Sequence, residues 1–256
     1  MISTAKNIIS AECVGEGEAI VFVHGLGSTS SVWEAQIRHF KSRFKTIRYD
    51  LDGSGRSSPS GELTVKGWVE DLSRLLDYYE VKAAHFVGHS LGTLILQHFA
   101  VQYPHKVIDL CLLGTNRSPN EQRRKALADR INKVTSNGLS SIVDAVVEGT
   151  LSPAILKKKP ELAGYVRELL LGQSDSGYLA SLHAVMGATA ADATQIKCPV
   201  LAIYGAEDKV SPQAVAETFV AELPRGELLA VDECGHWHPI EQPAAINTAL
   251  DKQLRA

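Results

Sequence analysis

The chain has 256 residues, a formal net charge of −3 at pH 7, and 45% hydrophobic against 21% charged residues. These proportions are typical of a globular protein with a sizeable core, and the length suits one α/β unit that carries an insertion. The densest basic run is short, Lys157-Lys158-Lys159, and Pro160 and Glu161 follow it, so we expect no nucleic-acid partner. No segment approaches the roughly 20 apolar residues that span a bilayer, and we expect no membrane partner.

The cysteines and the amino-terminal sequence indicate the cellular compartment of the protein. Cys13, Cys111, Cys198 and Cys234 are far apart and show neither Cys-x-x-Cys nor metal-ligand spacing, which favours free thiols and predicts no metal and no cofactor. The opening sequence MISTAKNIIS lacks the charged start and long apolar stretch of a secretion signal. We therefore expect a cytoplasmic protein, and the sequence predicts no particular oligomeric state.

Short apolar runs rich in β-branched residues predict the strands. Several, such as AIVFVH and VLAIY, are apolar throughout, as in strands that are covered on both faces of a parallel sheet. The predicted strands are residues 19–24, 45–50, 84–89, 107–113, 200–204 and 227–231.

Segments of helical period lie between these strands and carry start signals. Residues 31–34 (SVWE) have the form of a capping box, and Thr64 precedes apolar residues at helical spacing. Ser211-Pro212 predicts an N-cap followed by proline at the first helical position, and Gln242-Pro243 opens the last helix in a similar way. Alternating strands and helices predict an α/β fold with a mostly parallel, doubly wound sheet, whose ligands bind outside the carboxyl ends of the strands.

One long segment interrupts the alternation. Residues 117–195 show only helical patterns, at 120–134, 140–148, 161–171 and 178–186. Roughly 75 residues are too many for a plain connection between two strands. We predict a helical lid (cap) at 117–195 over a core formed by 1–116 and 196–256; the alternative is extra helical packing that never contacts substrate.

The strongest local motif surrounds Ser90. Gly88-His89-Ser90-Leu91-Gly92 follows an apolar strand directly and opens a helical segment. A strand before Gly-x-Ser-x-Gly and a helix after it is the context of a nucleophile elbow, in which the glycines allow a sharp reversal of the chain. We predict that Ser90 is a nucleophile rather than a serine that only caps the helix.

A serine hydroxyl needs a base that takes its proton, and nine histidines are candidates. His236 follows the last predicted strand, at the edge of the sheet where ligand chemistry belongs. His238 is the close competitor, but Gly235 favours a tight turn at His236. Other histidines are less well placed: His85 and His89 lie on or beside the strand of Ser90, His98 on the helix behind it, His39 and His105 on helix or loop positions, and His183 in the insertion.

The residue that orients the base should also follow a strand. Asp208 comes shortly after VLAIYG, with Glu207 as the alternative. The strand before the insertion ends in LGTNR without a carboxylate, and Asp52 belongs to a Gly-rich turn. The chain order Ser90, Asp208, His236 is the order of the triad on an α/β-hydrolase sheet.

Glycines after the predicted strand 19–24 could form the last component of the predicted active site, the oxyanion hole. His24-Gly25-Leu26-Gly27-Ser28 lacks the lysine of a phosphate loop, and it is not Gly-x-Gly-x-x-Gly. We expect the N–H groups of Leu26 and Leu91 to form an oxyanion hole.

Together these segments resemble the α/β-hydrolase superfamily along nearly the whole chain. HGLGS, YDLDGSGRS, GHSLG, GAEDKVSP and CGHWHPIEQP occur in the family's order and spacing. The resemblance implies the α/β-hydrolase fold, a Ser90–Asp208–His236 triad and oxyanion donors at Leu26 and Leu91. Within the superfamily, the chain is similar to the 3-oxoadipate enol-lactonase and carboxylesterase branch, although Thr93 stands where a second glycine usually follows Gly92.

These observations predict a serine hydrolase that cleaves a small carboxylic ester or lactone through an acyl-enzyme. Two alternatives remain open. A C–C bond hydrolase of the meta-cleavage type would use the same triad, and a hydrolase-like ligand-binding signalling protein would keep the triad but turn over slowly.

Overall fold

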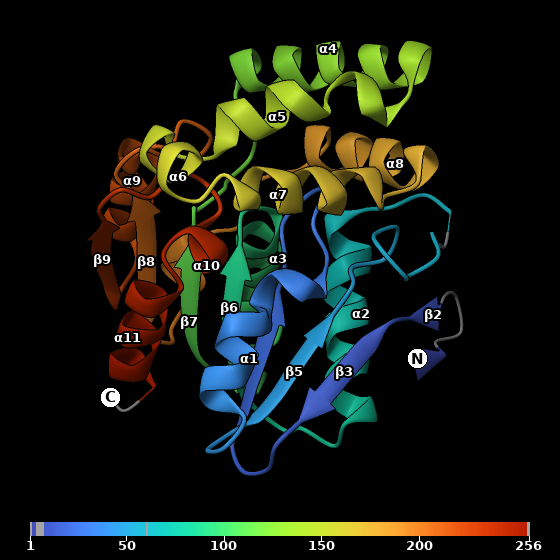
Figure 1. Cartoon of the computed structure of the whole chain (residues 1–256). Coiled ribbons are helices and arrows are strands. Elements are labelled where there is room, and N and C mark those ends of the chain that lie inside the picture. Colours follow the sequence, from blue (N-terminus) through green and yellow to red (C-terminus); the bar gives the residue numbers. More distant parts are fainter. Residues whose placement is uncertain (1, 4–7, 60, 255–256) are drawn as a thin grey trace.

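A seven-stranded sheet forms the centre of the molecule in the computed structural model, which describes residues 2–3, 8–59 and 61–254 (Figure 1). Its strand order is β3-β5-β4-β6-β7-β8-β9. Only the edge pair β3–β5 is antiparallel, and the other neighbours are parallel. The strands are β3 (Ala11–Val14), β4 (Ala19–Val23), β5 (Lys45–Tyr49), β6 (Ala84–His89), β7 (Val107–Leu113), β8 (Val200–Gly205) and β9 (Gly226–Val231). The predicted mostly parallel sheet of an α/β fold is confirmed. The six predicted strands correspond to β4–β9, and each observed strand begins and ends within one residue of its predicted bounds.

The sequence patterns missed the strands at the amino-terminus. β1 (Ile2–Ser3) and β2 (Ile8–Ile9) form a small antiparallel pair, and β3 adds an edge to the main sheet. Neither β2 nor β3 has the fully buried pattern that identified β4 and β6.

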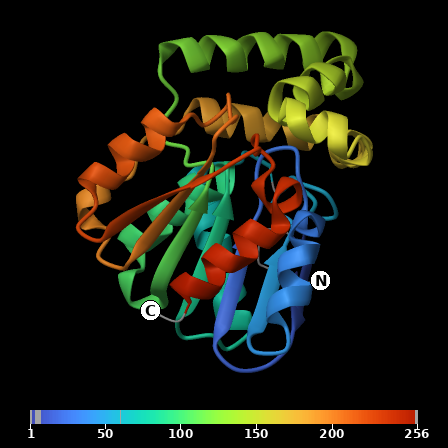
Figure 2. The ribbon, with the colours of Figure 1, turned by 60° about the vertical axis from the view of Figure 1, so that its left-hand side comes forward.

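Helices cover both faces of the sheet, so strand residues alternate between two apolar cores. Ile20 and Phe22 belong to one core and Val21 and Val23 to the other. The first core includes residues of α1 (Glu34–Phe40) and α11 (Pro243–Gln253), and the second includes residues of α2 (Val65–Tyr78), α3 (Leu91–Gln102) and α9 (Gln213–Glu222). Figures 1 and 2 show these helices on opposite sides of the strands. The sheet therefore has the doubly wound arrangement of layers.

Two of the predicted helix starts are wrong. Thr29 rather than Ser31 caps the turn before α1, because residues 30–33 form a 3-10 helix and Glu34 pairs with Arg38 and Arg48. Ser211 is not the cap of α9 either, since the helix begins at Gln213 after Pro212 and the Ser211 hydroxyl has no hydrogen-bond partner among the described residues. The predicted cap Thr64 and the opening proline of α11 are confirmed.

Five helices occupy the insertion between β7 and β8 and lie over the carboxyl ends of the strands (Figures 1 and 2). α4 packs against α8, and α5 packs against α7. They are α4 (Glu121–Asn137), α5 (Val143–Thr150), α6 (Pro153–Lys158), α7 (Glu161–Leu171) and α8 (Asp175–Met186). α6 was not predicted. Within the described residues, no helix has both the length and the apolarity that a membrane crossing needs.

Candidate active site

Ser90 lies at a sharp turn between β6 and α3, with φ 51° and ψ −111°. This positive φ is strained for a residue with a side chain. A Cβ at Gly92 would lie 2.3 Å from the carbonyl oxygen of Val23, and a Cβ at Gly88 would lie 2.9 Å from the backbone of Gly92. Glycine is therefore required at both positions because the backbone segments nearly touch. The turn brings the hydroxyl of Ser90 to the carboxyl edge of the sheet, beside the first N–H groups of α3.

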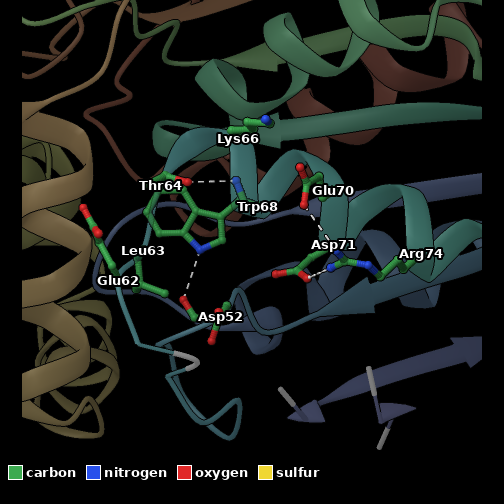
Figure 3. A pocket seen from close by; sticks show the side chains of 10 residues that line it. Asp52, Glu62, Leu63, Thr64, Lys66, Trp68, Glu70, Asp71 and Arg74 are labelled. Carbon is green, nitrogen blue, oxygen red and sulfur yellow. Dashed lines mark hydrogen bonds and ion pairs between the residues drawn. The ribbon is translucent and has the colours of Figure 1, made fainter. Parts of the chain in front are cut away.

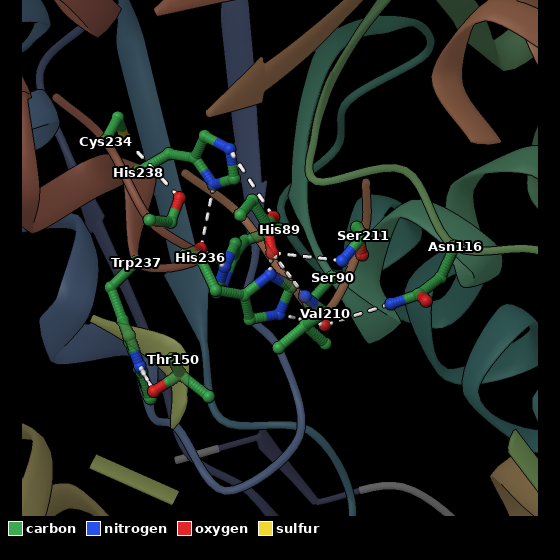
Figure 4. A network of polar contacts seen from close by, with 12 residues as sticks. His89, Ser90, Asn116, Thr150, Val210, Ser211, Cys234, His236, Trp237 and His238 are labelled. Carbon is green, nitrogen blue, oxygen red and sulfur yellow. Dashed lines mark hydrogen bonds and ion pairs between the residues drawn. The ribbon is translucent and has the colours of Figure 1, made fainter. Parts of the chain in front are cut away.

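His236 is hydrogen-bonded to both Ser90 and Asp208, and Figure 4 shows its ring beside Ser90. Its Nδ1 is 2.8 Å from Asp208 Oδ2, and its Nε2 is 2.9 Å from Ser90 Oγ. Because an ionised carboxylate only accepts hydrogen bonds, Nδ1 carries the proton, and Nε2 of the neutral ring is left to accept the Ser90 hydroxyl. The three residues that the sequence predicted are thus connected in the expected order.

Asp208 is buried and held in its ionised form. Burial on its own would raise the pKa of Asp208, but the neighbouring His236, its hydrogen bond and the Ser211 N–H outweigh burial and hold that pKa well below its usual range. Its second oxygen accepts the backbone N–H groups of Val210 at 2.8 Å and Ser211 at 3.0 Å. Glu207, the sequence-based alternative, does not make the bond to His236. The fixed carboxylate therefore sets both the tautomer and the orientation of the imidazole.

Two further histidines hold the backbone of His236. His89 Nε2 and His238 Nδ1 both donate to the carbonyl oxygen of His236, at 2.7 and 2.8 Å. Burial holds the pKa of His89 well below its usual value and lowers the pKa of His238 to about 4. Both rings are therefore neutral at pH 7. His238, the competitor for the role of base, faces this carbonyl and lies 3.9 Å from Asp208.

The inserted helices hold the other side of the His236 loop. The N–H of His236 donates to the Thr150 carbonyl at 2.7 Å. A Cβ at Gly235 would lie 2.6 Å from the same carbonyl and 2.5 Å from the Ser152 nitrogen. The sequence predicts a tight turn at Gly235, but the φ of Gly235 is not positive, so the close approach of residues 150–152 is what requires glycine there.

The predicted oxyanion donors belong to two segments: Leu91 directly follows Ser90, and Leu26 belongs to the loop after β4. Leu91 is the first residue of α3, so its N–H has no carbonyl partner within the helix. Gly25 lies against Ser90, because a Cβ there would be 3.0 Å from the Cβ of Ser90. His24 fixes this loop by donating to the Gly25 carbonyl at 2.8 Å and accepting the Leu51 N–H at 2.9 Å.

Sequence reasoning missed one polar neighbour of the nucleophile. Asn116 follows β7, and its Nδ2 lies 3.0 Å from Ser90 Oγ (Figure 4). This strand end lacks the carboxylate that a triad would use and presents an amide instead. Among the described residues, the Ser90 hydroxyl therefore has two side-chain hydrogen-bond partners, His236 and Asn116.

Neither a metal-binding cluster nor the hollow beside the start of α2 offers a second candidate site in the described part of the chain. Within the described part of the chain, no group of three or more His, Cys, Asp or Glu side chains could hold a metal ion. A hollow of about 540 Å³ lies beside the start of α2 (Figure 3), and Ser90, Asp208 and His236 are not among the residues that line it. Its polar groups bond to one another, as Trp68 Nε1 does to the Asp52 carbonyl at 3.1 Å and Arg74 to Asp71 at 2.7 Å.

Comparison with known proteins agrees with this architecture. The family model of the alpha/beta hydrolase fold matches residues 18–243. The chain belongs to the α/β-hydrolase family.

Particular relatives include lactonases and esterases. The chain is 30% identical over 239 residues to 3-oxoadipate enol-lactonase 2 of Acinetobacter baylyi, covering 93% of this chain and 88% of that protein. It is 27% identical to a pimeloyl-acyl-carrier-protein methyl ester esterase of Chromobacterium violaceum, covering 88% of this chain and 89% of the esterase. The crystal structure of an enol-lactonase from Burkholderia xenovorans superposes with a TM-score of 0.93 at 22% identity, covering 98% of each chain.

Proposed function

We propose that this protein is a serine hydrolase that cleaves a small carboxylic ester or lactone through an acyl-enzyme on Ser90. The observation that carries the proposal is the continuous chain of hydrogen bonds from Asp208 through His236 to Ser90. This arrangement supports nucleophilic catalysis because a neutral imidazole already faces the hydroxyl that it must deprotonate. The relatives named as enol-lactonase and methyl ester esterase support the choice of substrate class.

Each step of the proposed reaction uses a group in the site. His236 Nε2 takes the hydroxyl proton as Ser90 Oγ attacks the carbonyl carbon. The N–H groups of Leu26 and Leu91 stabilise the oxyanion, and His236 then protonates the leaving alcohol or enol oxygen. Water, deprotonated by the same imidazole, attacks the acyl-enzyme and releases the acid. Asp208 stabilises the imidazolium during both steps.

We also propose that residues 117–195 act as a lid. The helices lie over the carboxyl ends of the strands, and Thr150 bonds directly to the His236 loop. A lid in that place would shield the site from bulk solvent and contribute to the selection of the acyl group.

A substrate panel with purified protein tests the proposal. We expect wild-type protein to hydrolyse p-nitrophenyl acetate and at least one small lactone. Ser90→Ala should lose about 10³-fold or more of the rate, as expected when a nucleophile is removed. Ser58→Ala, at an exposed serine, should match wild type. Equal activity of Ser90→Ala and wild type would contradict the assignment.

The same panel separates the alternatives. A vinylogous diketone cleaved faster than every ester and lactone would indicate C–C bond hydrolysis. Tight binding of a small molecule with no turnover across the panel would indicate a signalling protein.

A further inference from the structure

Asn116 makes an unusual contact for a residue outside the triad, because it bonds to the nucleophilic atom itself. The hydroxyl proton of Ser90 is directed at His236 Nε2, so Oγ can only accept a second hydrogen bond. The contact of 3.0 Å from Asn116 therefore comes from its side-chain N–H. Figure 4 shows Ser90 between His236 and Asn116. One lone pair of Oγ is occupied by this bond, and the other is free to attack a carbonyl carbon.

The position of Asn116 is fixed by residues on α3. Its backbone N–H donates to Thr93 Oγ1 at 2.8 Å, and its carbonyl accepts Gln97 Nε2 at 2.7 Å. Thr93 in turn donates its hydroxyl to the carbonyl of Ser90 at 2.7 Å. The Thr93 side chain thus bridges the backbone of the nucleophile and the backbone of Asn116. Thr93 and Gln97 are completely buried, so water does not compete for these bonds.

We propose that Asn116 is a further catalytic residue whose side-chain N–H stabilises negative charge on Ser90 Oγ, and that Thr93 is the positioning residue that holds it there. This inference rests on the proposed function. As Ser90 passes its proton to His236, charge develops on Oγ, and a hydrogen bond to a charged oxygen is stronger than one to a neutral hydroxyl. Once the Oγ–carbon bond has formed, the ester oxygen is a weak acceptor and the contact weakens.

The same N–H acts again when the acyl-enzyme breaks down. Water attacks the acyl carbon, the bond between carbon and Oγ breaks, and Oγ carries the electron pair until His236 returns a proton. Asn116 therefore assists both the formation and the cleavage of the acyl-enzyme. This distinguishes it from the oxyanion donors, which act on the carbonyl oxygen.

A phosphorylating inhibitor tests the role of Asn116 without a natural substrate. Diisopropyl fluorophosphate forms a P–O bond to a serine Oγ and expels fluoride, so its second-order rate constant reports the nucleophilicity of Ser90. We expect Asn116→Leu to react about 10- to 100-fold more slowly than wild type, the range for a hydrogen bond to a charged group. Thr115→Val is the matched control, because the neighbouring Thr115 hydroxyl is buried without a hydrogen-bond partner among the described residues; it should react within about twofold of wild type.

The pH dependence of Asn116→Asp separates catalysis from a structural role. A protonated carboxylic acid donates to Oγ as the amide does, whereas a carboxylate repels the developing charge. The rate relative to wild type at the same pH should therefore rise as pH falls. A ratio that stays constant with pH would contradict the proposal.

Substitutions at Thr93 test how Asn116 is held. Thr93→Ser keeps the hydroxyl and should preserve the inhibitor rate, whereas Thr93→Val should lower it. Adding Asn116→Leu to Thr93→Val should then lower the inhibitor rate constant only a little further, because both substitutions act through one contact. If the double variant is slowed by the product of the two single effects, Thr93 does not position Asn116. Melting temperatures identify any variant that fails to fold, and Asn116→Ala replaces Asn116→Leu in that case.

Mass spectrometry of the labelled wild-type protein separates failure of this inference from failure of the proposed function. Wild-type protein without label on Ser90 would contradict the proposed function and the role of Asn116 with it. Label on Ser90 at equal rates in wild type and Asn116→Leu would contradict only the role of Asn116.

Discussion

The carboxylate of Glu241 accepts the backbone N–H of Trp237 at 2.7 Å. The Glu241 side chain is completely buried, and its other oxygen accepts the N–H groups of Gly235 at 2.9 Å and Ser152 at 3.0 Å. One carboxylate thus holds the chain on both sides of His236 and connects that loop to the inserted helices. The direction of the His236 ring therefore depends on Glu241, although Glu241 does not contact the ring.

Replacing Glu241 by Gln should loosen this connection. The amide keeps one acceptor oxygen but places an NH2 group against backbone N–H donors that then lack a partner. We expect the free energy of unfolding in urea to fall by about 1–3 kcal/mol, with a lower kcat on the best substrate. Glu217→Gln on the exposed face of α9 is the control and should change stability by no more than about 0.5 kcal/mol. Equal unfolding midpoints for wild type and Glu241→Gln would contradict this role.

Alanine at Gly92 should damage the nucleophile turn. Its Cβ would lie 2.3 Å from the carbonyl oxygen of Val23, which is backbone and cannot rotate away. We expect a loss of about 3 kcal/mol or more of stability, and loss of esterase activity. Gly164→Ala is the matched control, since no atom lies within 4 Å of its added Cβ, and it should stabilise α7 by about 0.5–1 kcal/mol. Thermal unfolding of both variants checks the contrast; a Gly92→Ala protein as stable as wild type would refute the close approach.

The sequence predicted the buried strands well and the edge strands poorly, for a physical reason. A strand covered on both faces, such as β4 or β6, is a continuous apolar run between turns. β3 is AECV, with every residue at least partly exposed, and a run of four such residues resembles a loop.

The Ser-Pro pattern alone does not predict where a helix begins. Ser152-Pro153 and Ser211-Pro212 have the same N-cap pattern, but only Ser152 caps a helix, with its hydroxyl accepting the Ile155 N–H at 3.0 Å. The Ser211 hydroxyl has no hydrogen-bond partner among the described residues, and the backbone N–H of Ser211 holds Asp208. A contact made by the fold thus overrides the local preference of the serine.

The triad candidates were predictable because their positions follow from the fold rule that ligand chemistry gathers at the carboxyl ends of strands. Asp208 and His236 each follow a strand that the sequence marks clearly. Asn116 also follows such a strand, and the signal was present in LGTNR. It was missed because an amide is not a usual triad member, and its contact with Ser90 depends on the tertiary contacts of Thr93 and Gln97 with the loop that carries it.

Asparagine at position 208 should remove most of the activity while leaving the fold intact. The amide no longer requires a proton on His236 Nδ1, so the imidazole can present the wrong tautomer to Ser90 and its charged form loses a counter-ion. We expect kcat to fall by about 10³- to 10⁴-fold, with a smaller change in KM. Steady-state kinetics on the best ester of the panel measures the effect. A loss of less than tenfold would mean that another group orients His236.

His85, on the far end of the same strand from Ser90, should make stability depend on pH. Burial lowers the pKa of His85, but its bond of 2.7 Å to Asp109 and the nearby Glu18 outweigh burial and raise that pKa. Since the folded pKa is above the unfolded value of about 6.5, the stabilisation is complete below that pH and is lost as pH rises through the folded pKa.

Urea unfolding of Asp109→Asn checks this sign. The variant should be destabilised more at pH 6 than at pH 9, because the charged partner matters only while His85 is protonated. His105→Gln, at an exposed histidine, should show no such trend. A destabilisation of Asp109→Asn that is equal at both pH values would rule out the proposed charge on His85.

The most direct test of the account is to trap the acyl-enzyme. Wild-type protein mixed with p-nitrophenyl acetate and quenched in acid should carry one acetyl group on the peptide that contains Ser90, detected by mass spectrometry. Ser90→Ala should carry none, and Asp208→Asn should acylate more slowly. Hydrolysis of the ester by wild-type protein with acetyl found on another residue, or by Ser90→Ala at the wild-type rate, would contradict Ser90 as the nucleophile.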